Sequence, residues 1–158
     1  GLMNGTANRI FAPNVSTTRA MIVTILWRLE GSPVVNFAMR VRDVVENAWY
    51  SEAVRWAAAN GIVNGYTEQT FGPNDNIARE QLAAILHRYA NYKGYDVSVG
   101  EDTNILSFDD AQTISGYAVP AMQWACGAGL MQGSNRKLLP TAEATRAQVA
   151  AMLHRFLG

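Results

Sequence analysis

The stretch that decides the fold is Gly61-Ile-Val-Asn-Gly65, which is followed by Phe71-Gly-Pro73 and then by Arg79. The same pattern occurs three times in 158 residues. The other two copies have the same order and nearly the same spacing, and they read Gly1-Leu-Met-Asn-Gly5, Phe11-Ala-Pro13, Arg19 and Gly129-Leu-Met-Gln-Gly133, Leu138-Leu-Pro140, Arg146. Self-similarity of this kind predicts a repeat protein, in which single copies cannot bury their apolar faces alone and must pack on one another.

A helix is predicted after each arginine, because the residues that follow it are apolar at helical spacing in all three copies. The recurring apolar positions are Ile22, Ile25 and Leu26, then Leu82, Ile85 and Leu86, then Val149, Met152 and Leu153. The second and third of these helices are predicted over residues 79–91 and 146–157. Thr18 and Thr145 can cap the helix starts, whereas Ala78 in the same place cannot.

A first helix is predicted ahead of two of the three glycine motifs, over residues 50–60 and 118–128. The segments that lead into these helices pair Asp43 with Asp110 and Trp49 with Tyr117, and the helices themselves pair Trp56 with Trp124. Gly61 and Gly129 then stand where a left-handed helix cap is needed. The first copy has no such half. We therefore predict an all-α fold of helix–loop–helix repeats around a pseudo-threefold centre, divided into a half copy at 1–31, a linker at 32–40, a copy at 41–91, a linker at 92–107 and a copy at 108–158.

Composition narrows the classes of function. Hydrophobic residues make up 49% of the chain, and 13 Lys plus Arg balance 13 Asp plus Glu, so a globular protein is expected, with no nucleic-acid partner and no membrane insertion. The apolar stretches are too short to cross a bilayer. Cys126 is the single cysteine. No motif for catalysis, metal binding or a cofactor occurs, so we expect a non-catalytic protein without a metal or cofactor.

The quoted motifs, together with Asp43-Val44, Trp49 and Trp56, resemble a tandem of S-layer homology domains over nearly the whole chain. The resemblance implies a secreted module at the bacterial cell wall or surface layer. Such modules bind secondary cell-wall polysaccharide, often through a pyruvylated amino sugar, in grooves between copies of a pseudo-trimer. The binding residues that it implies are the motif arginines Arg19, Arg79 and Arg146, with Asp43, Asp110, Trp49 and Tyr117 lining the grooves. The sequence departs from the family pattern at Ala78, and at Met21, Gln81 and Gln148, where the family has Glu.

The residue types themselves leave alternatives open at these positions. An arginine in the first turn of a helix is disfavoured by about 0.3–1 kcal/mol by the helix dipole. An anion held by the guanidinium and by free N–H groups would offset this cost, and so would a protein carboxylate such as Asp43 or Asp110. Trp49 and Tyr117 can stack on a sugar or pack in the core, whereas Trp56 and Trp124 are expected in the core. Asn64 and Gln132 can bond sugar hydroxyls or their own turns.

The missing half-copy leads to two further expectations. Without a first helix, Ile22, Ile25 and Leu26 should lack one neighbour, which predicts either a homodimer through that face or coverage by residues 33–39. A titration should also show fewer than three complete grooves. The alternative function is a protein-interaction or self-assembly module of a surface-layer protein, with the same grooves or the uncovered face as its binding surface.

Overall fold

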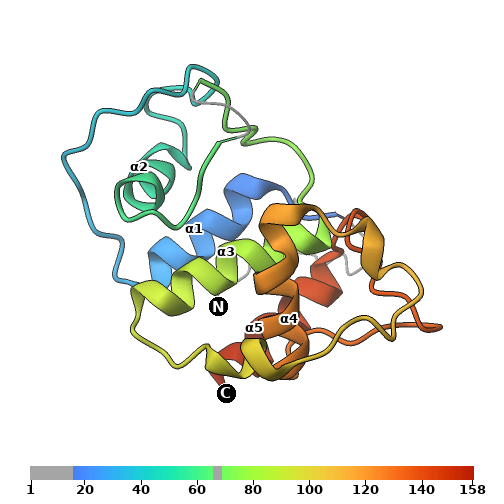
Figure 1. Cartoon of the computed structure of the whole chain (residues 1–158). Coiled ribbons are helices and arrows are strands. Elements are labelled where there is room, and N and C mark those ends of the chain that lie inside the picture. The colour runs from blue at the N-terminus through green and yellow to red at the C-terminus, as the bar shows by residue number, and fades with distance from the viewer. Residues whose placement is uncertain (1–15, 66–68) are drawn as a thin grey trace.

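Three helices begin at the motif arginines, and two of them are capped by the threonine that precedes the arginine. The computed structural model describes residues 16–65 and 69–158, and within these ranges it contains helices and isolated bridges but no strand (Figure 1). These three helices are α1 (Arg19–Leu29), α3 (Arg79–Tyr92) and α5 (Arg146–Leu157). Thr18 Oγ1 accepts the N–H of Met21 at 3.2 Å, and Thr145 Oγ1 accepts that of Gln148 at 3.2 Å. The all-α prediction is confirmed.

α3 starts without a side-chain cap because Ala78 has no acceptor, as the sequence predicted. Its glutamine supplies the other half of the motif, since the N–H of Ala78 donates to Gln81 Oε1 at 2.8 Å. Gln148 forms the equivalent bond with the N–H of Thr145 at 3.1 Å. Gln81 and Gln148 therefore both have a capping role at the starts of their helices.

The first helices are α2 (Ser51–Ala59) and α4 (Val119–Gly127), and each is followed, two residues after its end, by a glycine with positive φ. Gly61 has φ +70° and Gly129 has φ +75°, which confirms the predicted caps. The chain then turns back on the helix, with the N–H of Ile62 donating to Ala57 O at 2.9 Å and that of Leu130 donating to Ala125 O at 2.8 Å. Both side chains are buried, so each cap also anchors its loop in the core.

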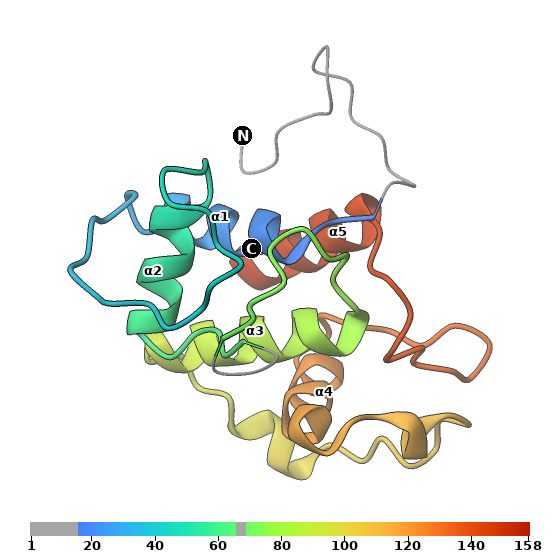
Figure 2. The same cartoon turned by 90° about the horizontal axis from the view of Figure 1, so that it is seen from above.

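Helices pack across copies: α2 of the second copy lies against α1 of the first, and α4 of the third copy lies against α3 of the second (Figures 1 and 2). The expectation of uncovered apolar residues on α1 is therefore wrong. Ile22, Ile25 and Leu26 are all buried. The homodimer predicted through that face has no support, because a helix of the same chain already occupies it.

The starts of α1, α3 and α5 are joined by a closed ring of three backbone hydrogen bonds. Thr17, Ile77 and Ala144 hold equivalent positions, two residues before each arginine. The N–H of Thr17 donates to Ala144 O at 3.2 Å, that of Ala144 to Ile77 O at 2.9 Å, and that of Ile77 to Thr17 O at 2.7 Å. Each copy thus contributes one donor and one acceptor to the ring.

The core of the protein is rich in aromatic side chains that link first helices to second helices. Trp56 of α2 contacts Tyr89 of α3, with ring centroids 6.4 Å apart, and Trp124 of α4 contacts Phe156 of α5 at 6.1 Å. Both tryptophans are buried, which confirms the sequence prediction for them. Tyr89 also donates its hydroxyl to Glu30 at 2.5 Å, and this hydrogen bond lowers the pKa of Glu30.

The two predicted linkers differ in what they contact. In residues 92–107 the short helix η2 (Ser98–Asp102) packs against α4, and Gly100 and Ile105 are buried, so this segment is more than a surface connection. A Cβ at Gly100 would lie 3.0 Å from the backbone of Trp124. In residues 32–40, by contrast, Val34 and Phe37 are exposed. None of the helices in the described part of the chain is long and apolar enough to span a membrane.

Candidate functional site

The motif arginine of the first copy reaches into the loop of the second copy. Arg19 donates from Nε to Phe71 O at 3.0 Å and from Nη2 to Asn64 O at 3.3 Å. Its guanidinium also lies over the Phe71 ring, 4.9 Å from the centroid. Only 5% of the residue is exposed. Arg19 therefore joins α1 to two parts of the second copy, the Gly-Ile-Val-Asn-Gly loop and the Phe-Gly-Pro turn.

Arg79 repeats this arrangement one copy later. It donates from Nε to Leu138 O at 2.9 Å and from Nη2 to Gln132 O at 3.4 Å, and it is 9% exposed. Burial lowers the pKa of Arg79, while the nearby Cys126 and Asp110 act in the opposite direction. Arg146 is also buried, with 5% exposed. In sequence, Asn4 and Phe11 of the first copy correspond to Asn64 and Phe71, and they lie outside the described residues.

The two predicted aspartates accept hydrogen bonds from the backbone of two turns. The carbonyls of these same turns accept hydrogen bonds from Arg19 and Arg79. Asp43 accepts the N–H groups of Phe71 at 2.8 Å and Gly72 at 2.7 Å. Asp110 accepts those of Leu138 and Leu139, each at 2.8 Å. Burial raises the pKa of Asp110, but the two backbone hydrogen bonds outweigh it, and the net shift is downward. Asp43 and Arg19 thus both bond to Phe71, and Asp110 and Arg79 both bond to Leu138. One residue of the turn connects each aspartate with its arginine, in place of a direct ion pair.

The N–H groups at the starts of α1 and α3 are also engaged by the neighbouring copy. The N–H of Arg19 donates to Asp75 O at 2.9 Å, and that of Arg79 donates to Ala142 O at 2.9 Å. The next N–H groups donate to Pro73 O and Pro140 O. These carbonyls complement the positive end of each helix, so the first two N–H groups of α1 and of α3 are already engaged within the protein.

Two grooves of similar size lie above these arginines, and they are built from equivalent residues. The α3 groove, of about 340 Å³, is lined by Arg19, Val63, Asn64, Gly65, Gln81, Ala84, Ile85, Arg88 and Tyr117. The α5 groove, of about 380 Å³, is lined by Arg79, Leu130, Met131, Gln132, Gly133, Ser134, Lys137, Leu139, Ala147, Gln148, Ala151, Met152 and Arg155. Volumes of this size suit one or two sugar-sized groups.

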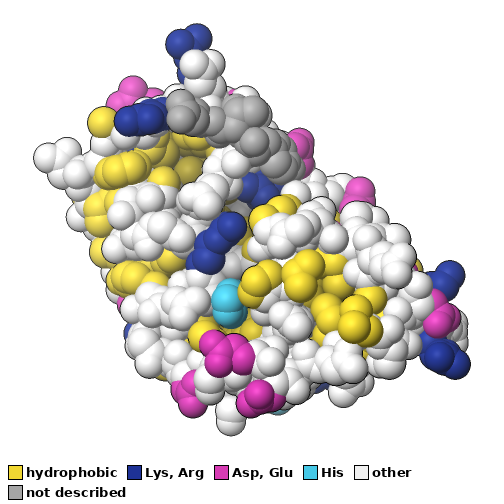
Figure 3. All heavy atoms as spheres, viewed as in Figure 1, with side chains coloured by type: hydrophobic (Ala, Val, Ile, Leu, Met, Phe, Trp, Pro, Cys, Tyr) yellow, Lys and Arg dark blue, Asp and Glu magenta, His cyan; other side chains and the backbone are white. Residues whose placement is uncertain are grey.

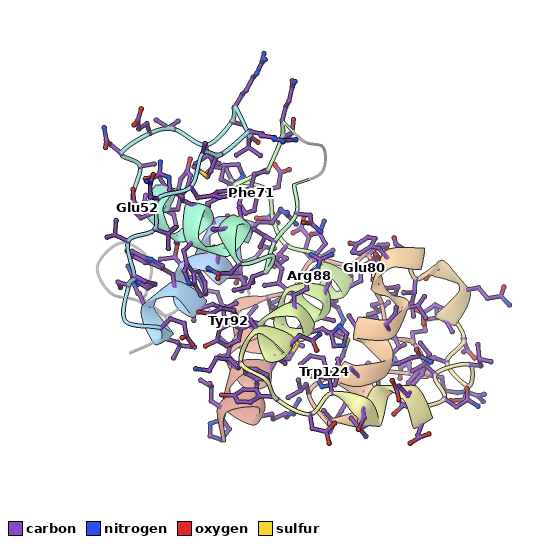
Figure 4. The ribbon with its side chains drawn as sticks, turned by 60° about the vertical axis from the view of Figure 1, so that its left-hand side comes forward. Glu52, Phe71, Glu80, Arg88, Tyr92 and Trp124 are labelled. Atoms are coloured by element: carbon purple, nitrogen blue, oxygen red, sulfur yellow. The ribbon has the colours of Figure 1, made fainter. Side chains whose placement is uncertain are left out.

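The lining of both grooves is cationic. The α3 groove contains Arg19 and Arg88, the α5 groove contains Arg79, Lys137 and Arg155, and neither lining includes an Asp or Glu. Arg88 lies on α3 in Figure 4, on the same helix as Glu80 and beside α4 with Trp124. Figure 3 shows Lys and Arg side chains at the centre of one face, between two hydrophobic areas. A chain with a net charge of zero thus concentrates positive charge in its grooves.

Sequence analysis did not identify the basic residues at the groove rims as candidate site residues. Arg28, Arg88 and Arg155 follow the motif arginine of their copy at the same distance. This recurrence could have identified Arg88 and Arg155 as candidates. Lys137 has no basic counterpart, because Thr70 holds its place in the second copy. Only the structure shows which side chains along α3 and α5 face the grooves.

The two predicted aromatic residues are both exposed, but they differ in position. Tyr117, from η4 (Gly116–Ala118), lines the α3 groove and is 55% exposed. Trp49 is 59% exposed, packs edge-on against Tyr50 and lines neither of these two grooves. Tyr117 belongs to the third copy, Arg19 to the first and Arg88 to the second. The α3 groove therefore combines side chains from all three copies.

The predicted amide residues divide between the grooves, with Asn64 in the α3 groove and Gln132 in the α5 groove. Their backbone carbonyls receive the buried arginines, and both side chains are exposed. Among the described residues, no cluster of His, Cys, Asp and Glu could hold a metal ion. His87 instead packs against Trp124, with ring centroids 5.3 Å apart.

Comparison with known proteins identifies the repeat. A model of the S-layer homology domain matches residues 42–83 and 107–150. The chain is 31% identical over 99% of its length to an endoglucanase of Bacillus sp. (strain KSM-635), and 30% identical over 98% to a surface-layer 125 kDa protein of Lysinibacillus sphaericus. A cellulosome-anchoring protein of Acetivibrio thermocellus is 26% identical over 55% of the chain.

The chain spans only a small part of each of these relatives, namely 16% of the endoglucanase, 13% of the surface-layer protein and 20% of the cellulosome-anchoring protein. The similarity to an enzyme therefore concerns a segment of that enzyme. The family model covers more than half of the chain, and the match to the endoglucanase runs through nearly all of it. On this evidence the chain belongs to the S-layer homology domain family.

Proposed function

We propose that this chain is a non-catalytic anchoring module that binds an acidic cell-wall polysaccharide in the grooves between its copies. Membership of the family, together with relatives named as a surface-layer protein and a cellulosome-anchoring protein, indicates a location at the cell surface and cell wall. In that setting the module attaches a larger protein to the wall without a covalent bond. The acidic groups of the polysaccharide, such as a pyruvyl ketal carboxylate, are its main contact.

The observation that carries the proposal is the cationic lining of two grooves built in the same way. A carboxylate on a sugar meets Arg88 at the rim of the α3 groove, and Arg155 with Lys137 at the rim of the α5 groove. The buried Arg19 and Arg79 form the base beneath them. Hydrogen bonds between charged partners contribute about 1.5–3 kcal/mol each, and absence of acidic residues from the lining avoids repulsion.

The ring of backbone hydrogen bonds at Thr17, Ile77 and Ala144 supports an arrangement of the copies around a pseudo-threefold axis. In this arrangement each motif arginine belongs to one copy, the loop that receives it belongs to the next, and the aromatic residue before the following first helix belongs to the third. A groove is then complete only when three successive copies contribute. The α3 groove meets this condition, with Arg19, Arg88 and Tyr117.

Binding is tested by sedimentation with purified bacterial cell wall, before and after its covalently attached polysaccharide has been removed. We expect Arg88→Gln and Arg155→Gln each to weaken retention by about tenfold, or 1.4 kcal/mol. Arg136→Gln is the matched control, because it removes the same charge from an exposed arginine that lines neither groove. Circular dichroism checks that all three variants stay helical.

Each outcome separates the functions under consideration. Retention that disappears on removal of the polysaccharide and falls in the two groove variants alone supports glycan binding. Retention that survives removal of the polysaccharide refutes it and favours the protein-interaction alternative. Equal losses in all three variants would show that net charge, rather than the grooves, governs retention.

A further inference from the structure

The second copy contains an apolar pocket that is separate from the two grooves. It has a volume of about 360 Å³ and lies between α2, the segment 37–41 and the loop at 63–65, and we call it the α2 pocket. One of the two hydrophobic areas in Figure 3 lies over α2. The buried Phe71 lies beside α2 (Figure 4) and contributes to the lining. The main apolar residues of the lining are Met39, Val41, Val54, Ala58, Val63 and Phe71.

The backbone takes the same course at the equivalent place in the third copy. The N–H groups of Arg42 and Asp109 each donate, at 2.7 Å, to the carbonyl two residues ahead of the Phe-Gly-Pro or Leu-Leu-Pro turn of their own copy. The residue after each of them is the aspartate that accepts the N–H groups of that turn. Val41 and Phe108, which directly precede Arg42 and Asp109, are therefore counterparts in space as well as in sequence.

A phenyl ring occupies this place in the third copy. The ring of Phe108 lies so close to Gly133 that a Cβ added to the glycine would be 2.3 Å from Cε1 of the ring. Gly65, the counterpart of Gly133, lines the α2 pocket together with the smaller Val41. The pocket therefore lies where the third copy carries a ring of its own.

The other lining residues differ between the copies in the same direction. Alignment of α2 with α4, and of the two glycine loops, pairs each of three pocket residues with a larger side chain in the third copy. These counterparts are Met122 for Val54, Cys126 for Ala58 and Met131 for Val63. Since the backbone is held in the same way, the α2 pocket is open because its side chains are small.

The lining favours an aromatic side chain as the occupant. Phe108 shows that a phenyl ring carried by a polypeptide fits this place in the same fold. A sugar unit would bury several hydroxyl groups against the apolar lining, where few groups could bond them, and this is unfavourable. Aromatic residues are also enriched at the centres of protein interfaces, where they insert into pockets of the partner.

The charge at the pocket indicates what should lie next to that aromatic side chain. Arg40 is the charged residue among the described residues of the lining, and it is exposed. Phe37, also in the lining, is 41% exposed and extends the apolar surface outward. A carboxylate beside the inserted ring would form a charge-assisted contact with Arg40.

We propose that the α2 pocket is a docking site for a partner polypeptide, which inserts an aromatic side chain and places a neighbouring acidic residue against Arg40. Docking at this pocket does not require glycan binding, although residues 63–65 line both the pocket and the α3 groove. The partner is recognised by an aromatic residue followed by an acidic one, as in Phe108-Asp109 of this chain.

The probe is a capped tetrapeptide with the sequence of residues 107–110, Ser-Phe-Asp-Asp, titrated into the whole chain while amide shifts are recorded by NMR. We expect saturable shifts at the amides of Val54, Ala58 and Val63. The matched peptide has serine in place of phenylalanine, and it should bind more weakly by about tenfold or more.

Two variants fill the pocket with the residues of the third copy, and a further one removes its charge. Val41→Phe and Val54→Met should each weaken binding of the peptide by about tenfold and raise the thermal midpoint by about 2–4 °C, because a cavity is filled. Arg40→Gln should weaken binding by about threefold. Arg136→Gln is its matched control, because Arg136 is exposed and lies outside the pocket.

Saturable binding that needs the phenylalanine and weakens in a stable filled variant supports the proposal. It is overturned if no saturable shift appears up to about 10 mM peptide, if the serine peptide binds equally well, or if the filled variants bind like the original chain. A midpoint that falls in both filled variants also overturns it, since the pocket would then have no room. Shifts at the same amides with an acidic saccharide alone would assign the pocket to the glycan instead, and a dimer that Val41→Phe dissociates would assign it to a second copy.

Discussion

At the scale of single residues, the motif arginines Arg19 and Arg79 have a structural role, because they bind one copy to the next. Each guanidinium of Arg19 and Arg79 is nearly enclosed and donates to two backbone carbonyls of the next copy. Sequence analysis had predicted that an arginine in the first turn of a helix needs compensation, because the helix dipole disfavours a positive charge there. It could not show that carbonyls supply it, because those carbonyls lie 45 to 59 residues away along the chain.

Arg79→Ala therefore tests the structural role of the arginine. With Leu138 O and Gln132 O left without this donor, we expect the free energy of unfolding to fall by about 2–4 kcal/mol. Urea denaturation measures this loss. Arg155→Ala, at the exposed rim, should change stability by less than about 1 kcal/mol, and equal stability of both variants would contradict the structural role.

At the scale of elements, the helices were predictable and their partners were not. The predicted bounds agree with α5 at both ends and with α2, α3 and α4 to within one residue, because glycine caps and helical spacing are local signals. The pairing of α2 with α1 and of α4 with α3 depends on the way the copies join, which spacing does not encode. For this reason Ile22, Ile25 and Leu26 were expected to lack a neighbour, whereas α2 packs against α1 and all three are buried.

The contact between η2 and α4 gives a prediction at the same scale. Gly100→Ala places a Cβ 3.0 Å from the backbone and the Cβ of Trp124, so η2 must move away from α4. We expect a loss of about 1–3 kcal/mol in the free energy of unfolding, measured by chemical denaturation. Gly116→Ala is the control, because nothing lies within 4 Å of its added Cβ and its backbone is not in the left-handed region. Equal losses in the two variants would mean that the close approach at Gly100 does not matter.

At the scale of the whole molecule, every feature of the candidate site is shared between copies. A loop from one copy, an arginine from the preceding copy and, in one groove, an aromatic from the following copy come together only in the assembled fold. Sequence analysis named part of this set, namely Arg19, Arg79, Tyr117, Asn64 and Gln132, but not Arg88, Lys137 or Arg155. It did not predict how they divide between two grooves, which depends on the direction in which the copies follow one another around the ring.

This division predicts two unequal classes of sites for a defined acidic saccharide. The α3 groove has Tyr117 for stacking in addition to its arginines, so it should bind more tightly than the α5 groove, which has charge alone. Titration calorimetry, together with amide shifts at Ala84 and Ala151, would resolve the two classes. Tyr117→Ala should weaken the tighter class by about tenfold and leave the other unchanged.

Trp49→Ala is the matched control for this titration, because Trp49 is as exposed as Tyr117 but lines neither of the two grooves. It should leave both classes as they are. Sites of equal affinity in the unchanged chain, or an equal effect of the two aromatic variants, would contradict the assignment of Tyr117 to the α3 groove. Because the α3 groove draws on three copies and the α5 groove on two, the difference in affinity between the two classes measures what the additional copy contributes to a site.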